Sequence, residues 1–277
     1  MSTSPLTQAE VDQFQNDGYL IRRAYYDADE MDLLLRTARN DREMLSHNIP
    51  VKDAAGRQSR LSLWNHPGDD LYGMFSRGRR MVDAMEQLLG DEVYHYHSKM
   101  MLKEPQVGGA WEWHQDYGYW YQNGCLFPDM CSGLIAVDRA TRENGCLQLL
   151  KGSHKMGRVE HGRFGEQTGA DPERVEQAIE RFEMVYFEAA PGDVLFFHAN
   201  TLHASAANTS PRPRWSLICC YNTKHNDPYK KSHHPGYTPL KKVDDDMIKK
   251  VGAKGSGTDQ NSFLKKEEDQ TIAAGKK

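Results

Sequence analysis

The chain has 277 residues, a formal net charge of −4, 38% hydrophobic residues and 10% aromatic residues. This composition supports a folded core, and a single mainly β domain can reach this length. No apolar run approaches the roughly 20 residues needed to cross a bilayer, and the first residues lack the basic and apolar regions of a secretory signal. The acidic balance also lacks the positive field that phosphate binding requires. We therefore expect a cytoplasmic protein without membrane or nucleic-acid partners.

The five cysteines form no CxxC pair. An odd number of cysteines favours free thiols in a reducing compartment. We expect them to pack in the core.

Helical signals dominate the first third of the chain. Thr7 followed by Glu10 forms a capping box at the start of the first helix. Residues 28–46 repeat apolar side chains at helical spacing, and a similar stretch ends at Gly90. Residues 1–90 are therefore predicted to be the helical part of the domain.

From residue 93 onward the hydrophobic period changes to two, which is typical of strands. Strand signals cover residues 93–103, 111–116, 131–137, 146–150, 184–187, 194–198 and 215–221, and residues 172–182 form one helical interruption. Many short strands separated by turns predict a barrel or jelly roll. We place this core at 91–225, within a single domain over 1–250. Residues 251–277, rich in Lys, Gly and Ser, are predicted to be a flexible tail.

A possible metal site begins at His114-Gln115-Asp116. On an extended strand, residues two apart project from the same face, so His114 and Asp116 can hold one ion while Gln115 points away. His203, which follows Asp116 by 87 residues, can complete the set. Two imidazoles and one carboxylate are the ligands of non-heme Fe(II) oxygenases, which leave adjacent positions free. We predict these three residues as the metal ligands.

The third ligand has to be chosen among 12 histidines, and His198 is the nearest rival. His198 ends an apolar run and can be a core residue at a strand end. His203 precedes the small residues 204–207, which leave room for a ligand. We therefore prefer His203.

Arg214 lies 11 residues after His203 and opens a predicted strand. The alternative for this arginine is an exposed surface cation. If it points into the barrel, it needs an anion, because burying a guanidinium unpaired costs several kcal/mol. A dicarboxylate co-substrate would give one end to Arg214 and a chelating end to the metal.

Alternation along residues 93–103 places His95, His97, Lys99 and Met101 on one face. This face is either solvent-exposed or part of a cavity, and we favour the cavity because the metal strand follows after a short loop. Lys99 would then meet a carboxylate of the co-substrate or of the substrate.

Aromatic residues surround the first ligand: Trp111, Trp113, Tyr117, Tyr119, Trp120 and Tyr121. Some of them only fill space. Trp120, six residues past His114, lies in a loop near the metal, where rings suit a compact cationic or zwitterionic substrate through cation–π contact. We expect Trp120 and Tyr117, with His95 and His97, to contact the substrate.

Four sequence features together resemble the phytanoyl-CoA dioxygenase (PhyH) family over about residues 10–225. They are WHQD, NGCLQLLKGSHK, PGDVLFFH, and an H-x-S whose histidine is followed by an arginine 11 residues later. The resemblance implies a double-stranded β-helix (jelly roll, cupin-like) core with flanking N-terminal helices, and Fe(II), 2-oxoglutarate and O2 as cofactor and co-substrates. It implies iron binding by His114, Asp116 and His203. Arg214 and Ser205 would hold the distal carboxylate of 2-oxoglutarate.

The stretch WEWHQDYGYWYQNG is similar to the signature of ectoine hydroxylases within this family. A small soluble substrate is therefore expected rather than an acyl-CoA. His95 and His97 stand where these enzymes carry glutamines, and Lys99 where they carry arginine, so ectoine itself is not expected. Asp116 separates the chain from the halogenases of the family, in which a small residue replaces the carboxylate.

The predicted function is hydroxylation of an unactivated C–H bond in a small metabolite, with release of succinate and CO2. Desaturation or cyclisation at the same iron is an alternative outcome. A further alternative is a non-catalytic cupin-type binding protein that uses His95 and His97 as its ligands. The protein is expected to be a monomer or a homodimer.

Overall fold

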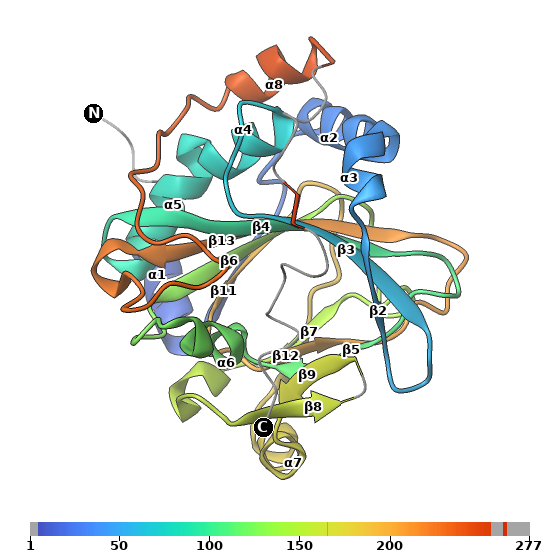
Figure 1. Ribbon diagram of the computed structural model, residues 1–277, viewed down its shortest axis with the longest axis vertical. Helices are drawn as coiled ribbons and strands as arrows, with labels where there is room; N and C mark the ends of the chain where they lie inside the picture. Colours follow the sequence, from blue (N-terminus) through green and yellow to red (C-terminus); the bar gives the residue numbers. More distant parts are fainter. Residues whose placement is uncertain (1–4, 165, 256–262, 265–277) are drawn as a thin grey trace.

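The computed structural model describes residues 5–164, 166–255 and 263–264. Two antiparallel sheets face each other, and most of the helices pack on the outer face of the larger sheet (Figure 1). The larger sheet contains, in order, β1 (Tyr19–Arg22), β11 (Val194–His198), β6 (Met130–Ala136), β13 (Arg214–Thr223), β4 (Val93–Lys103), β3 (Gln58–Trp64) and β2 (Ile49–Lys52). The smaller sheet contains β10 (Met184–Tyr186), β7 (Leu147–Leu150), β12 (His203–Ser205) and β5 (Trp111–His114).

The remaining elements cover or connect these sheets. A hairpin is formed by β8 (His161–Phe164) and β9 (Gln167–Ala170). The helices are α1 (Gln8–Asp17), α2 (Ala28–Asn40), α3 (Arg42–Ser46), α4 (Leu71–Arg77), α5 (Arg79–Leu89), α6 (Asp116–Trp120), α7 (Pro172–Arg181) and α8 (Met247–Gly252). Short 3-10 turns are η1 (Tyr121–Asn123), η2 (Ser153–Met156) and η3 (Lys224–Asn226).

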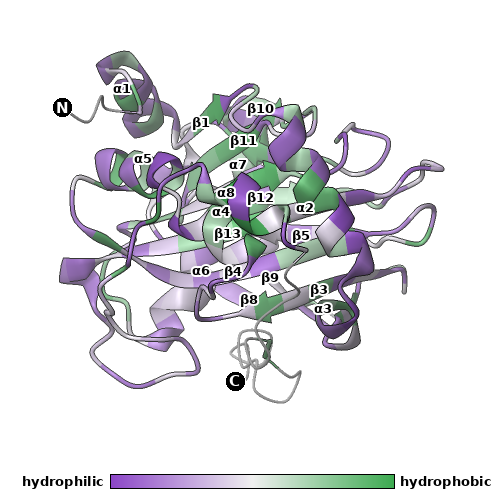
Figure 2. Cartoon of the chain, turned by 90° about the horizontal axis from the view of Figure 1, so that it is seen from above, coloured by the Kyte–Doolittle hydropathy of each residue, from purple (hydrophilic) through white to green (hydrophobic). Residues whose placement is uncertain are grey.

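Two hydrophobic clusters hold the sheets in place. One lies between the larger sheet and its helices, and includes Phe75, Met85 and Leu217. The other fills the space between the two sheets, and includes Leu134, Leu149 and Phe197. Hydrophobic residues gather along central elements such as β11, whereas the outer loops are mostly hydrophilic (Figure 2). The five cysteines are all buried and free, as expected.

The local signals in the N-terminal part have clear structural counterparts. Thr7 and Glu10 form the predicted capping box of α1. The predicted helix over 28–46 is divided in two, because Asp41 is extended and its side chain caps α3 by accepting from the Met44 amide at 3.0 Å. Within the described residues, no helix is long and apolar enough to span a bilayer.

Residues 1–90, predicted as the helical part of the domain, contain strands as well, because β1, β2 and β3 belong to the larger sheet. Leu61 and Leu63 on β3 alternate with polar residues, but this alternating run is too short to predict a strand on its own. Its partner β2 starts with the sequence Ile-Pro, and a proline is not typical of the interior of a strand. β3 pairs with β4, and β2 pairs with β3 at the edge of the sheet.

The predicted flexible tail over 251–277 is wrong for its described part. Residues 251–252 end α8. Phe263 is buried against Trp64, with ring centroids 5.5 Å apart. The Leu264 amide donates to the Leu63 carbonyl at 2.8 Å. Residues 256–262 and 265–277 lie outside the described residues.

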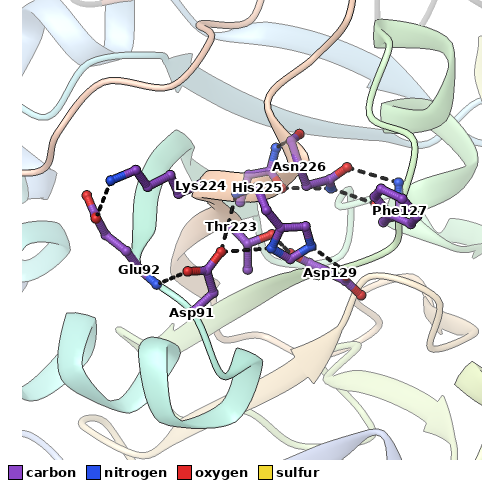
Figure 3. Close-up of polar contacts among 9 residues, drawn as sticks. Asp91, Glu92, Phe127, Asp129, Thr223, Lys224, His225 and Asn226 are labelled. Carbon is purple, nitrogen blue, oxygen red and sulfur yellow. Dashed lines mark hydrogen bonds and ion pairs between the residues drawn. The ribbon is translucent and has the colours of Figure 1, made fainter.

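A polar network on the surface joins the turn before β4 to η3 (Figure 3). His225 Nδ1 lies 2.7 Å from Asp91 Oδ2, and its Nε2 lies 2.9 Å from Asp129 Oδ2. Beside it, Lys224 pairs with Glu92. The hydrogen bond to Asp91 and, to a smaller extent, the one to Asp129 raise the pKa of His225 above its usual value of 6.5.

The raised pKa predicts a pH-dependent stability. The charged imidazole stabilises the folded state below the unfolded pKa, and this contribution is lost as the pH rises through the folded pKa. His225→Gln should therefore lower the free energy of unfolding by up to ~1 kcal/mol near pH 6, since the site is exposed, and by less near pH 8.5. Urea unfolding of both proteins at the two pH values tests this. An equal loss at both values would contradict the role of the charge.

Candidate active site

The structure brings together the three residues predicted as metal ligands. His114 ends β5 and His203 begins β12, and the strand register pairs them directly. The Nε2 atoms of both histidines lie 3.9 Å from Asp116 Oδ1. One ligand atom of each residue lies within 4.8 Å of the others, and all three residues are buried. The site therefore lies in the interior, between the two sheets.

The predicted strand over 111–116 is too long. β5 ends at His114, and Asp116 is the first residue of α6. The carboxylate thus reaches the two imidazoles because the chain turns into a helix, and not because residues 114 and 116 share a strand face.

Hydrogen bonds fix the orientation of each of these side chains. His114 Nδ1 lies 2.7 Å from the Glu112 carbonyl, and His203 Nδ1 lies 2.9 Å from the Thr201 carbonyl. A carbonyl only accepts, so Nδ1 carries the proton in both rings and the Nε2 lone pairs are free. Burial lowers the pKa of both histidines, which favours these neutral forms.

The carboxylate is held in the same way. Ser132 Oγ donates to Asp116 Oδ2 at 2.9 Å, which leaves Oδ1 directed toward the imidazoles. Two neutral nitrogens and one carboxylate oxygen with free lone pairs make a donor set that fits Fe(II).

Gln115 points away from the metal ligands, as the sequence predicted, and anchors them. Its amide nitrogen donates to the carbonyls of Gly157 and Asn200 at 2.8 Å each. Its amide oxygen accepts from the Val159 backbone at 2.7 Å. These contacts tie the end of β5 to two loops and fix the positions of both neighbouring ligands.

The rival ligand His198 lies elsewhere. Its ring packs against Phe14 and His154, and its Nδ1 accepts from the Asn200 amide at 3.1 Å. It is not part of the metal-ligand cluster found among the described residues.

A cavity extends from His114 and His203 to Arg214, with Ser205 and Lys99 in its wall. Arg214 is 6% exposed and donates to the Gly145 carbonyl at 2.8 Å and to Ser216 Oγ at 3.2 Å. Its Nε has no partner in the described part of the chain. Burial lowers the pKa of Arg214 to about 10. Among the residues that the structure describes, the buried guanidinium has no anionic contact, and it suits the distal carboxylate of a dicarboxylate.

A second cavity also borders His114 and includes Asp116 in its wall. Its wall contains aliphatic side chains of β2 and β3, together with His97 and Trp120. Lys99 lines both cavities and therefore lies at the boundary between them.

The expected common face of His95, His97 and Lys99 is wrong, because β4 contains a bulge at Tyr96. Cys220 of β13 pairs with His97, and Tyr221 pairs with His95, so Tyr96 has no partner. His95 turns to the helix side, where it contacts the Asn65 carbonyl at 3.0 Å and Ser98 Oγ at 2.7 Å. It lines neither cavity.

Tyr119, and not the predicted Tyr117, lines a cavity of the site. The Tyr117 hydroxyl donates to the Cys125 carbonyl at 3.1 Å, and the ring lines neither cavity. Tyr119 lines the second cavity, 5.5 Å from the His114 ring between centroids. Residues three and four apart share a helix face, so Tyr119 and Trp120 follow Asp116 into the cavity.

Sequence reasoning missed two further residues near the site. Lys103 is fully buried and contacts Ser205 at 2.7 Å. His234, from the segment after β13, stacks on His97 with ring centroids 4.8 Å apart. Burial lowers the pKa of both residues. Lys103 lies two and four residues after Met101 and Lys99 on β4, so strand alternation could have found it, whereas His234 lies in a segment without any periodic signal.

The family model of phytanoyl-CoA dioxygenase (PhyH) matches residues 6–216. The chain belongs to this family. The predicted enzyme class, a dioxygenase, is thereby confirmed. L-proline trans-4-hydroxylase from Streptomyces griseoviridis is 30% identical over 204 residues, which cover 66% of this chain and 76% of that protein. Ectoine dioxygenase from Sphingopyxis alaskensis is 26% identical over 238 residues, which cover 80% of this chain and 78% of that protein.

Solved structures of other proteins show the same fold. The crystal structure of EctD from S. alaskensis with bound Fe superposes with a TM-score of 0.75, at 23% identity, over 88% of this chain and 89% of that chain. The carbocyclase SnoK from nogalamycin biosynthesis has a TM-score of 0.63 at 18% identity, over 87% and 96% of the two chains. The predicted jelly-roll fold class is confirmed.

The metal-ligand assignment predicts a sharp contrast between neighbouring histidines. His203→Ala should lose iron and all formation of succinate from 2-oxoglutarate, because one of three ligands is removed. His198→Ala should keep both, since its ring lies outside the cluster. Iron content after dialysis and succinate yield with ascorbate measure the two effects. Loss of iron in His198→Ala alone would overturn the assignment.

Proposed function

We propose that the protein is an Fe(II)- and 2-oxoglutarate-dependent hydroxylase of a small soluble metabolite. The observation that carries this proposal is the convergence of two imidazole Nε2 atoms and one carboxylate oxygen within 4.8 Å, next to a cavity that ends at a buried arginine. Family membership supports it. Relatives named for L-proline and ectoine support a small substrate.

In this proposal His114, Asp116 and His203 hold iron, and Arg214 with Ser205 binds the distal carboxylate of 2-oxoglutarate. Iron bound with 2-oxoglutarate and O2 supplies the oxidising power to break an unactivated C–H bond, and succinate and CO2 are released. The protein positions the two substrates and excludes water. The cation of Lys99 lies where both cavities meet and can contact a carboxylate of either molecule.

In this proposal the substrate occupies the second cavity, whose wall combines aliphatic and aromatic side chains with a few polar groups, as in many small-molecule sites. Rings of Tyr119 and Trp120 cover one wall and can pack on a cationic group. Lys99 and His97 face the same space, and Asp116 is the sole carboxylate in the described lining. Because Asp116 is assigned to the metal, a zwitterion fits this cavity better than a purely cationic molecule.

Among the alternatives, a cupin-type binding protein with His95 and His97 as ligands is disfavoured, because the β4 bulge turns these two rings to opposite sides of the sheet. Desaturation or ring closure at the same iron differs from hydroxylation only in the later fate of the substrate radical. Product mass distinguishes these outcomes.

We also propose a cytoplasmic monomer or homodimer. Five buried free thiols support a reducing compartment.

The direct test is a screen of amino acids, small amines and phosphonates with the purified protein, Fe(II), 2-oxoglutarate and ascorbate. A substrate should raise succinate formation above the slow uncoupled rate and gain one oxygen atom by mass spectrometry. If 2-oxoglutarate is not consumed with or without any of these compounds, the proposed function is wrong.

Trp120 is expected to bind the substrate and not the iron. Trp120→Ala should weaken substrate binding by about 3- to 30-fold, the range of one cation–π contact, and lower the ratio of product to succinate. The matched control is Tyr117→Phe, since that ring lines neither cavity and should leave this ratio unchanged. Steady-state kinetics and iron content measure both variants. A loss of iron in Trp120→Ala would point to a structural role instead.

A further inference from the structure

Lys103, the last residue of β4, is buried beside the cavity that contains Arg214. Its side chain is 0% exposed, and the strand register sets it directly opposite Arg214. The Nζ atom lies 2.7 Å from Ser205 Oγ and 3.3 Å from the Ser205 carbonyl oxygen, and it also donates to the Ala206 carbonyl. In the part of the chain that the structure describes, no carboxylate hydrogen-bonds to this ammonium. Three neutral oxygens therefore surround it.

This contact restricts the hydroxyl of Ser205. An ammonium group only donates, so Ser205 Oγ accepts from Lys103 and its own proton has to point elsewhere. Ser205 lines the cavity, and no acceptor for its hydroxyl proton is found among the described protein groups. The proton is thus available to an anion in the cavity.

Arg214, on the neighbouring strand β13, can also bind an anion in the cavity. Two of its nitrogens donate to the neutral oxygens of Gly145 and Ser216, and its Nε is unpartnered within the described residues. Two buried cations therefore lie on neighbouring strands, and neither has a carboxylate contact among the described residues, which is costly in a protein interior. Burial, and next the charge of Arg214, lower the pKa of Lys103. An anion in the cavity would stabilise the charged form of Lys103 and so oppose the effects of burial and of the Arg214 charge on its pKa.

We propose that Lys103 is a positioning residue that makes the cavity selective for a keto acid with a second carboxylate. Lys103 does not line the cavity, so it acts through Ser205. The Lys103 ammonium donates to Ser205 Oγ, so that the serine hydroxyl proton points toward the distal carboxylate. Arg214 on β13 binds the same carboxylate. This inference rests on the proposed function, since it takes 2-oxoglutarate as the co-substrate.

A purely structural role predicts something different. Lys103 also ties β4 to the segment after β12 through the two carbonyls. If that were its whole role, removing the ammonium would lower stability and would weaken all keto acids equally. The distal carboxylate is therefore the group that the test has to vary.

The test compares 2-oxoglutarate with 2-oxopentanoate, which has the same chain length and no distal carboxylate. Calorimetric binding to protein loaded with Mn(II) gives a readout that does not depend on turnover. Lys103→Met should weaken 2-oxoglutarate by about tenfold or more, the range for a hydrogen bond to a charged group. The affinities for 2-oxopentanoate and for Mn(II) should change by less than about twofold.

Ser205→Ala is the matched variant, because it removes the hydroxyl through which Lys103 acts. It should weaken 2-oxoglutarate to a similar degree. The double variant should be no weaker than the weaker single variant, because both changes remove one coupled contact. Additive losses would overturn the inference.

Equal weakening of both keto acids in Lys103→Met, or an unchanged affinity for 2-oxoglutarate, would also overturn it. If Lys103→Met does not fold, Lys103→Gln retains a donor without the charge and should reduce the preference for 2-oxoglutarate by a smaller factor, and an unchanged preference would overturn the inference. Wild-type protein that binds neither keto acid would instead contradict the proposed function.

Discussion

The antiparallel pairing of β12 with β5 is the constraint on which the active site depends. It sets His203 opposite His114 between the two sheets, where burial excludes water from both rings. Backbone carbonyls two residues upstream of each histidine fix its tautomer. Asp116 joins them because the chain turns into α6 immediately after β5. The backbone thus brings the three ligands together, and the side chains of Ser132 and Gln115 hold them in place.

Much of this arrangement could be predicted from the sequence. The period-two pattern after residue 93 gave most strands of both sheets, and the capping box at Thr7 gave the first helix. The ligand set followed from the chemistry of His114, Asp116 and His203, and the small residues after His203 favoured it over His198. These features can be predicted from the sequence because alternation and capping depend on residues close together in the chain, and because metal ligands belong to few residue types.

The rest depended on contacts between distant segments. The bulge at Tyr96 inverts the direction of every side chain before it on β4, and nothing local marks its position. That one residue explains why His97 reaches the cavity and His95 does not. The five-residue helix α6 is too short to show a helical period, so the sequence favoured Tyr117 where the helix face selects Tyr119. The burial of Lys103 likewise depends on β12, which is remote in sequence.

The contact of Phe263 and Leu264 with β3 has a consequence for how the chain can be shortened. Phe263 packs on one face of Trp64, while Leu264 bonds the backbone of Leu63, whose side chain faces the second cavity. Phe263 and Leu264 thus support, from outside, the strand that forms one wall of the second cavity. A shortened version that ends after α8 would keep every ligand residue, but β3 would lose these contacts and hold the cavity wall less firmly.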